Sequence, residues 1–395
     1  MRRVNMENNM TQLSSEMFSK AIRENFSVED AVEMLRECTS FRTLSQKLNA
    51  FSKGRDIKSL LIKGLCENHP DANPDTVSRN VRNWLNDRQS RLHKQDAIEL
   101  CFILGLSFEE SNGLVAMISE EALHWRHPDE IPYIFALINN LSYAKATEIH
   151  EKIKEKLPAV SHTDAEEEAF TDVVKSEIKK IKSEDELVNY VVNNYNKLSS
   201  LHNTAYSLFS EMMEILESPA DTDLSEDGYL PESEKYSVGR IVQAYMHRED
   251  IPEVSDKKKK AVFSALERNI AQSWPSETAL SRIINRHTDV TRKVLILLFL
   301  ATYDPEYISD DDEDAFLDWD PDYEKTKDEI FEEYYTNMNN MLEKCGFAAL
   351  DPRSPFDWIV IFCMCIDDIY ELDSTLSDFL RTLFANDENG NALQN

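Results

Sequence analysis

Glycine is scarce in this chain, and its scarcity limits the folds that the chain can adopt. Only 8 of the 395 residues are glycine, roughly 2% where a typical soluble protein has about 7%. Tight hairpins, phosphate-binding loops and the switch points of α/β sheets all use glycine, because it adopts left-handed backbone conformations without a steric penalty. The alternation of apolar and polar residues that marks half-buried strands is absent as well. The sequence therefore predicts an all-α fold.

Helix signals recur along the whole chain. Residues 27–30 (Ser-Val-Glu-Asp), 107–110 (Ser-Phe-Glu-Glu) and 183–186 (Ser-Glu-Asp-Glu) each have the form of a capping box at a helix start. No fixed period marks a solenoid, and a degenerate helical repeat within 158–395 is left open. Hydrophobic periodicity predicts helices over residues 12–24, 28–39, 41–51, 56–68, 75–87, 94–104, 107–118, 129–140, 142–157, 163–181, 184–196, 198–217, 237–247, 256–273, 277–286, 290–303, 323–344, 355–372 and 374–385.

Charge is distributed unevenly between the two halves of the chain. The sequence holds 43 Lys and Arg against 73 Asp and Glu, a net charge of −30. Residues 1–157 hold 21 basic and 23 acidic side chains, whereas residues 158–395 carry −28. The window 41–94 has 11 basic and 5 acidic residues, a net of +6. A local basic surface of this kind attracts phosphate groups even in an acidic protein, and a solvated helical face is the alternative interpretation.

Cysteine spacing and hydropathy indicate the compartment. The six cysteines (Cys38, Cys66, Cys101, Cys345, Cys363 and Cys365) are scattered and form no disulfide framework, which favours a reducing compartment. No apolar segment follows the first residues, as it does in a secretory signal. The longest apolar runs, 294–301 and 358–366, are shorter than the ~20 residues that span a bilayer. We therefore expect a cytoplasmic protein without a membrane segment.

Composition predicts how the chain is divided. Prolines and clusters of acids mark two segments as linker or loop. The expected parts are an N-terminal helical extension at 1–40, a five-helix domain at 41–118, a connector with long helices at 119–217, an acidic linker at 218–235, and an acidic helical domain at 236–395 with a loop at 304–322.

The helix predicted at 75–87 has the clearest chemistry in the chain. Val77, Val81, Trp84 and Leu85 fall at i, i+4, i+7 and i+8 and form one apolar stripe. Asn73-Pro74-Asp75 precedes the helix as a turn with a capping residue. The remaining positions direct hydroxyl, guanidinium and carboxamide groups outward, and these groups read base edges in a major groove. They are Thr76, Ser78, Arg79, Arg82, Asn83 and Asn86.

This stretch resembles the lambda-repressor-like helix-turn-helix domain, the XRE class of bacterial and phage regulators. The resemblance covers about residues 41–118. It rests on the Thr-Val-Ser-Arg-x-x-x-x-Trp-Leu helix at 76–85, the short polar connection at 86–91, and the helix end Leu-Cys-Phe-Ile-Leu-Gly-Leu-Ser at 100–107. It implies a scaffold helix at 57–68 and a recognition helix at 76–86.

The same resemblance implies which side chains would touch DNA. Contacts to bases would come from Thr76, Ser78, Arg79, Arg82 and Asn83. Contacts to phosphates, which fix register rather than sequence, would come from Lys53, Arg55, Lys58, Arg88 and Arg91. The alternative is that the same five-helix bundle has Trp84 and Leu85 as core residues and binds only proteins.

Catalytic and metal-binding patterns are weak. The sequence has no nucleophile elbow, no P-loop and no dinucleotide fingerprint, so we expect no enzyme activity, no cofactor and no metal. His124 and His127 lie at i and i+3, and Cys363 and Cys365 lie inside an apolar run, where a core role is the simpler interpretation. The acids of 318–329 match the spacing of an EF-hand loop, but Tyr323 stands where that loop needs glycine.

These observations lead to one functional hypothesis and one alternative. The hypothesis is a sequence-specific regulator of transcription that binds double-stranded DNA as a homodimer, because one short recognition helix reads few base pairs. The acidic region after about residue 158 would serve for sensing, oligomerisation or contact with a protein partner. The alternative is a non-enzymatic acidic helical adaptor that binds a protein partner in a mobile-element or defence system.

Overall fold

The protein is helical throughout the part of the chain that the structure describes. The computed structural model describes residues 27–37, 43–86, 92–157, 171–198, 202–217, 235–253, 263–303, 326–365 and 371–385. Within these ranges there is no strand, only an isolated antiparallel bridge between Glu121 and Phe347. The predicted all-α fold is confirmed, and each described α-helix overlaps a predicted range.

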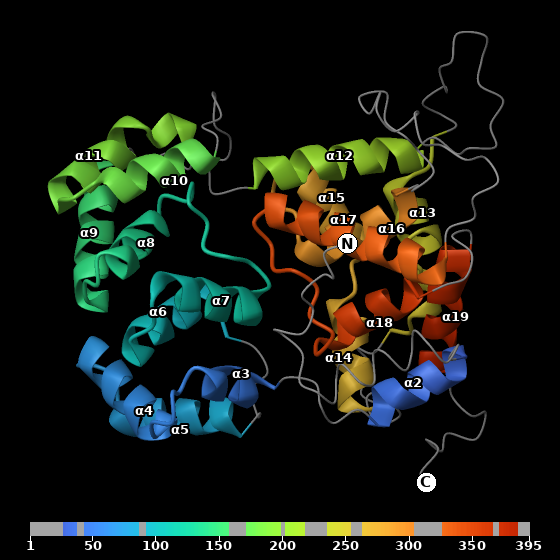
Figure 1. The fold of residues 1–395 in the computed structure, drawn as a ribbon, viewed down its shortest axis with the longest axis horizontal. Helices are drawn as coiled ribbons and strands as arrows, with labels where there is room; N and C mark the ends of the chain where they lie inside the picture. Colours follow the sequence, from blue (N-terminus) through green and yellow to red (C-terminus); the bar gives the residue numbers. More distant parts are fainter. Residues whose placement is uncertain are drawn as a thin grey trace. The chain divides into compact units, whose positions relative to one another are not determined.

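The helices are numbered as in Figure 1. They are α2 (Val28–Glu37), α3 (Leu44–Ala50), α4 (Ile57–Asn68), α5 (Pro74–Leu85), α6 (Lys94–Leu104), α7 (Phe108–Ser119), α8 (Ile131–Ile138), α9 (Tyr143–Lys156), α10 (Thr171–Lys180), α11 (Glu184–Asn193), α12 (Asn203–Glu217), α13 (Val238–Ala244), α14 (Ala265–Ser273), α15 (Glu277–Ile284), α16 (Arg292–Thr302), α17 (Lys327–Lys344), α18 (Pro355–Cys363) and α19 (Leu372–Phe384), with 3-10 turns η2 (Tyr195–Lys197) and η3 (Arg248–Asp250).

Local sequence explains where many of these helices begin. Ser107 and Ser183 each accept the amide of the residue three positions on, and the Glu at that position accepts the Ser amide in return. Ser27 and Asp30 make the same reciprocal pair at the start of α2. The three predicted capping boxes are therefore present. Gly105 ends α6 in a left-handed conformation, with φ of 62°, which a glycine adopts without strain.

The helices group into two units. Unit 1 contains residues 1–41, 205–342 and 349–395, and unit 2 contains residues 42–204 and 343–348. The helices predicted as a connector are thus divided, because α8 to α11 belong to unit 2 while α12 belongs to unit 1. The predicted linker 218–235, apart from Lys235, and the predicted loop 304–322 lie outside the described residues.

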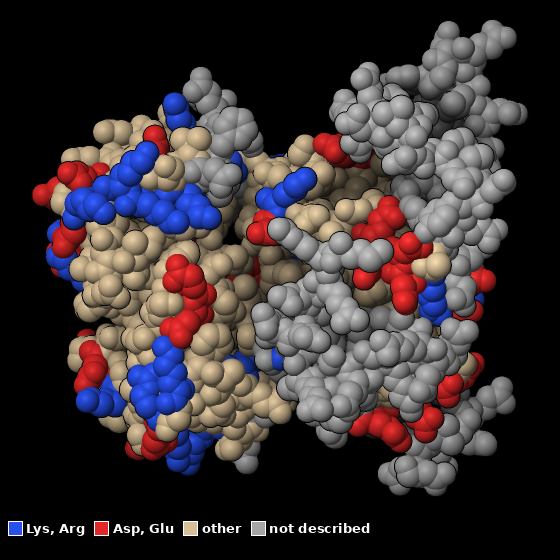
Figure 2. Space-filling view, viewed as in Figure 1, with Lys and Arg blue, Asp and Glu red and all other residues tan. Residues whose placement is uncertain are grey.

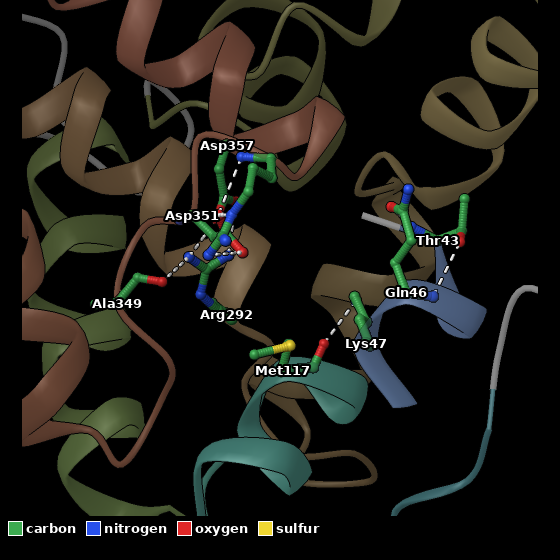
Figure 3. Close-up of polar contacts among 9 residues, drawn as sticks. Thr43, Gln46, Lys47, Met117, Arg292, Ala349, Asp351 and Asp357 are labelled. Carbon is green, nitrogen blue, oxygen red and sulfur yellow. Dashed lines mark hydrogen bonds and ion pairs between the residues drawn. The ribbon is translucent and has the colours of Figure 1, made fainter. Parts of the chain in front are cut away.

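Helix α2, from the segment predicted as an N-terminal extension, packs on α19 within unit 1. The Arg36 guanidinium donates to the carbonyl of Leu383 at 2.8 Å and pairs with Glu267 at 3.1 Å. In unit 2, α6 packs on α4 and α7, and α9 packs on α8 and α11. The Lys47 ammonium on α3 donates to the carbonyl of Met117 on α7 at 2.6 Å (Figure 3). Each unit therefore joins helices that are distant in sequence.

A corresponding helix order appears in both units. We call α3 to α9 module A and α13 to α19 module B. The segments that lead into α8 and α18, residues 123–135 (LHWRHPDEIPYIF) and 350–362 (LDPRSPFDWIVIF), share Leu, Arg, Pro, an acid, Ile and Phe at equal spacing. Both segments follow the C-terminal end of a long helix, α7 or α17, and open the next one.

The polar contacts of the two modules correspond as well. Asn112 on α7 accepts the Leu123 amide at 2.9 Å, and Asn339 on α17 accepts the Leu350 amide at 2.8 Å. Each pair is separated by 11 residues in the sequence. These two bonds fix the same connection in each module, because a buried amide needs a partner.

Helix α8 in module A and helix α18 in module B each begin near an acid that binds one cation and one backbone amide. Glu130 pairs with Lys94, the first residue of α6, at 2.8 Å and accepts the His124 amide at 2.7 Å. Asp357 pairs with Arg292, the first residue of α16, at 2.8 Å and accepts the Asp351 amide at 2.8 Å (Figure 3). Among the described residues, α3 packs on α5 and α8 on α9 as α13 packs on α15 and α18 on α19, whereas the packing of α4 on α5 and α6 has no counterpart for α14. The two modules thus correspond in these contacts and differ around α4 and α14.

The similarity extends to the start of each module. Lys53 lies ten residues after the N-cap Thr43 and has a φ of 53°, and His247 lies ten residues after the N-cap Ser237 and has a φ of 50°. The connection between α6 and α7 spans residues 105–107, whereas that between α16 and α17 spans residues 303–326. The repeat therefore has no constant spacing, which explains why the sequence showed no period.

Candidate nucleic-acid interface

Helix α5 of module A carries the predicted base-contacting residues. Val77, Val81 and Trp84 are buried, as their spacing predicts, and Leu85 is half-buried. Asn73 accepts the Asp75 amide at 2.9 Å, and Pro74 is the first helical residue, so the helix begins as the Asn-Pro-Asp sequence predicts. One face of α5 is therefore anchored in the core of unit 2, which holds the opposite face in place.

The opposite face of α5 is open to solvent. Thr76, Arg79 and Arg82 are exposed, and Ser78 and Asn83 are half-buried. The Arg82 Nε donates to the carbonyl of Ser78 at 3.3 Å, which leaves most of its guanidinium available. All five predicted base-contacting residues thus lie on one helix, and two arginines of one turn lie at its exposed face.

A buried carboxylate holds the turn between α4 and α5. Glu99 on α6 is only 6% exposed. Its two oxygens accept the Asn68 side-chain amide at 2.9 Å and contact the His69 Nε2 at 3.0 Å. These contacts fix the C-terminal end of α4 and the first residue of the turn. Sequence reasoning missed Glu99 because a lone acid within an apolar helix gives no signal of its partners.

Close packing of α4 on α6 also positions α5. A Cβ placed at Gly64 on α4 would lie 2.5 Å from the Ile103 Cγ2 on α6. The two helices approach each other at this point only because Gly64 has no side chain. Since α4 packs on both α5 and α6, this contact determines how close α4 lies to α6 and thereby the position of α5.

The predicted phosphate-contacting residues differ in their surroundings. Lys53 pairs with Glu110 at 2.8 Å, and that hydrogen bond lowers the pKa of the Glu110 carboxyl. Arg55 donates to the carbonyls of Ser52 and Leu104, so its guanidinium is partly used in closing the end of α6. Lys58 is exposed at the start of α4. Arg88 and Arg91 lie outside the described residues.

Module B provides a comparison for this surface. Helix α15 ends at the C-cap Asn285 as α5 ends at the C-cap Asn86. Counted back from these caps, the positions of Arg79 and Arg82 are held by Thr278 and Ser281. The positions of Lys53 and Arg55 are held by His247 and Glu249, counted from the N-caps of α3 and α13. The two modules share several internal contacts, but α15 has one exposed arginine, Arg282, at the position of Asn83 in place of the arginine pair of α5.

The histidine pair considered for a metal is part of an aromatic cluster. His124 is buried, and its ring stacks on that of His202 with centroids 4.2 Å apart. Burial, followed by the charge of His202, lowers the pKa of His124 well below 6.5. Burial likewise lowers the pKa of His127. Within the described ranges, no group of three or more His, Cys, Asp or Glu side chains is arranged to hold a metal ion.

The remaining candidates are buried or outside the described residues. Cys363 is fully buried in α18, and burial raises the pKa of Cys365 to about 12, so both thiols stay protonated at neutral pH. The acidic residues 318–325 lie outside the described ranges. In the part of the chain that the structure covers, no helix combines the length and apolar character needed to cross a membrane.

Comparisons of the chain with protein-family models, with curated proteins and with solved structures find no match. Figure 2 shows Lys and Arg side chains on the surface of unit 2, near α4 and α5 and also over α10. The functional assignment therefore depends on the chemistry of these surfaces.

Proposed function

We propose that the chain is a DNA-binding regulator of transcription that reads double-stranded DNA with the exposed face of α5. One observation carries this proposal: Arg79 and Arg82 project from a helix anchored in the core, whereas Thr278 and Ser281 hold their positions in α15, which has a single arginine, Arg282. Neither arginine takes part in the polar contacts that the two modules share, so these contacts do not require them. Their role therefore lies at the surface.

The chemistry of the α5 face suits a major groove. Arginine forms bidentate bonds to guanine, and hydroxyl and carboxamide groups bond to several base edges, so Arg79, Arg82 and Asn83 supply base-reading groups. Lys58 and the exposed part of Lys53 would contact the flanking phosphates, which add affinity without sequence information. We propose a homodimer, since one helix of this length covers a single half-site. The acidic unit 1 would sense a ligand or bind a partner.

A pair of charge-matched variants tests this proposal. Arg79→Gln with Arg82→Gln removes two positive charges from α5, and Thr278→Glu with Ser281→Glu adds two negative charges at the corresponding positions of α15. Two lost base contacts of ~1 kcal/mol or more each should weaken binding by at least about 30-fold. The measurement is fluorescence anisotropy against a pool of duplexes that includes the gene's own upstream region. The α15 variant should bind as the wild type does.

The alternative is the acidic adaptor that binds a protein partner. It is supported by the −30 net charge and predicts that no duplex binds even at low salt. Equal weakening by the α5 and α15 variants would also contradict the proposal, because it would indicate a general charge effect. Circular dichroism of both variants establishes that the fold is retained.

A further inference from the structure

Helix α10 presents a second group of cations in unit 2. Val174 and Ile178 are each 1% exposed and anchor the helix. Lys179, Lys180 and Lys182 are exposed, and Lys175 is half-buried. Figure 2 shows blue side chains over the part of unit 2 where Figure 1 places α10. We call Lys175, Lys179, Lys180 and Lys182 the lysine band. In a chain of net charge −30, such a band needs a physical explanation.

The lysines of this band lack acidic partners among the described residues, unlike other lysines of the unit. Lys94 pairs with Glu130, and Lys145 and Lys152 both pair with Glu148, at 2.6 to 2.9 Å. The acids nearest in sequence to the band have other partners. Glu177 accepts the Tyr190 hydroxyl at 2.8 Å, and Glu186 accepts the amides of residues 182 and 183. The lysines of the band therefore form no ion pair with a described side chain, although four acids (Glu177, Glu184, Asp185 and Glu186) lie in the same stretch of the chain.

Trp125 holds two of these ammonium groups in place. The Lys175 Nζ lies 5.9 Å and the Lys179 Nζ 5.8 Å from the centroid of the Trp125 ring. Like charges at i and i+4 on a helix repel each other. The indole ring offsets part of this repulsion, and a bound anion would offset more. The two cations are thus positioned before any ligand arrives.

Module B indicates that the module fold does not need this arrangement. The residue that corresponds to Trp125 in the second copy of the Leu-to-Phe segment is Pro352. Helix α10 follows α9, the last helix of module A, and lies at the end of unit 2 opposite to α4 and α5 (Figure 1). The lysine band therefore belongs to an element added to the module.

We propose that the lysine band of α10 is a second DNA-backbone contact, which binds the phosphates of the duplex without reading sequence. This inference rests on the proposed function of α5 and extends it. Lysine ammonium groups act as point charges on phosphates, and the band has no group suited to base recognition. Since the band and α5 lie at opposite ends of unit 2, the two surfaces contact different parts of a long duplex. The band adds affinity, and α5 adds specificity.

The test compares two double variants of equal charge. Lys180→Gln with Lys182→Gln removes two cations of the band and leaves the contacts of Trp125 intact. Lys145→Gln with Lys152→Gln removes two cations that already have acidic partners. Binding to a duplex of about 40 base pairs, several turns of about 10 base pairs each, is measured over a range of salt concentrations. The band variant should lower the slope of log affinity against log salt by about 2, since each phosphate contact contributes about 0.9.

The outcomes separate this inference from the proposed function. The sequence preference should not change in the band variant, and the paired-lysine variant should keep the wild-type slope. An unchanged slope in the band variant, with specific binding still lost in the α5 variant, would overturn the inference alone. Binding that depends on the band but not on α5 would overturn the proposed function alone. Lysine-dependent binding to phosphatidylserine vesicles without binding to duplex would overturn both.

Discussion

The buried pair of Arg292 and Asp357 gives the sharpest stability prediction. Both side chains are 3% exposed, and the guanidinium donates to the two carboxylate oxygens at 2.8 Å each. In Asp357→Asn the buried arginine loses the negative charge of the carboxylate whose two oxygens it binds, and the Asp351 amide loses a charged acceptor. Breaking a buried pair from one side costs about 3 to 5 kcal/mol. We expect unit 1 to be destabilised by about that amount.

The corresponding change in module A should cost less. The Lys94 side chain is 18% exposed, and its ammonium group lies 3.4 Å from a second acid, Glu121. In Glu130→Gln the ammonium group therefore keeps an ion pair with Glu121 and contact with solvent. The expected loss is about 1 to 2 kcal/mol. Unfolding of the two units must be followed separately, because a chain with two units need not unfold in one step. Hydrogen exchange of the α16 to α18 and the α6 to α8 peptides in urea gives both free energies.

A double variant distinguishes the ion pair from simple packing. Arg292→Met with Asp357→Leu replaces both charges by apolar groups of similar size, and such replacements are often close to neutral. We therefore expect the double variant to be more stable than Asp357→Asn. The reasoning would be refuted if Asp357→Asn lowered the free energy of unfolding by less than about 1 kcal/mol. It would also be refuted if the double variant were less stable than both the wild type and Asp357→Asn. Equal losses in the two modules would show that burial does not determine the cost.

Three further outcomes follow from the described contacts. Because the pKa of His124 is lowered in the folded protein, the neutral ring contributes stability above pH 6.5, the ordinary pKa of histidine, and this contribution is lost as the pH falls below that value. The urea midpoint of unfolding should therefore drop from pH 7 to pH 5. The drop should be smaller in His124→Phe. Gly64→Ala should destabilise unit 2 by about 1 kcal/mol net, because the clash of the new methyl group with Ile103 exceeds the gain in helix propensity. At Gly113 there is open space around the position of a Cβ, so Gly113→Ala should stabilise unit 2 by about 1 kcal/mol. Glu99→Gln should weaken DNA binding more than its small loss of stability explains, as measured by anisotropy and urea unfolding, because it loosens the turn before α5.

Local features of the fold could be predicted from the sequence. Helices α4, α5 and α6 follow from apolar residues at helical spacing, and three capping boxes follow from Ser and an acid three positions apart. The buried stripe of Val77, Val81 and Trp84 was predicted for the same reason. Each of these features depends on residues within about one or two helical turns, where spacing determines which side chains share a face.

Long-range features could not be predicted in this way. Arg292 meets Asp357 across 65 residues, and α2 packs on α19 from near the other end of the chain. His202 stacks on His124 although no local pattern connects them. The spacing between the two modules changes where residues 303–326 replace a three-residue connection, so a search for a constant period finds nothing. Such pairings are set by the packing of whole helices, which one sequence does not reveal.

The two modules together separate the needs of the fold from those of function. Where both copies have the same contact, as at Asn112 and Asn339 or at Glu130 and Asp357, the contact closes a helix connection and is sufficiently explained by stability. Where the copies differ at exposed positions, stability explains little, because surface substitutions usually change it by less than about 0.5 kcal/mol. The α5 arginines belong to this second group, and the lysines of α10 lie on a helix that follows module A. The functions of the chain should therefore be sought first in what module A has and module B lacks.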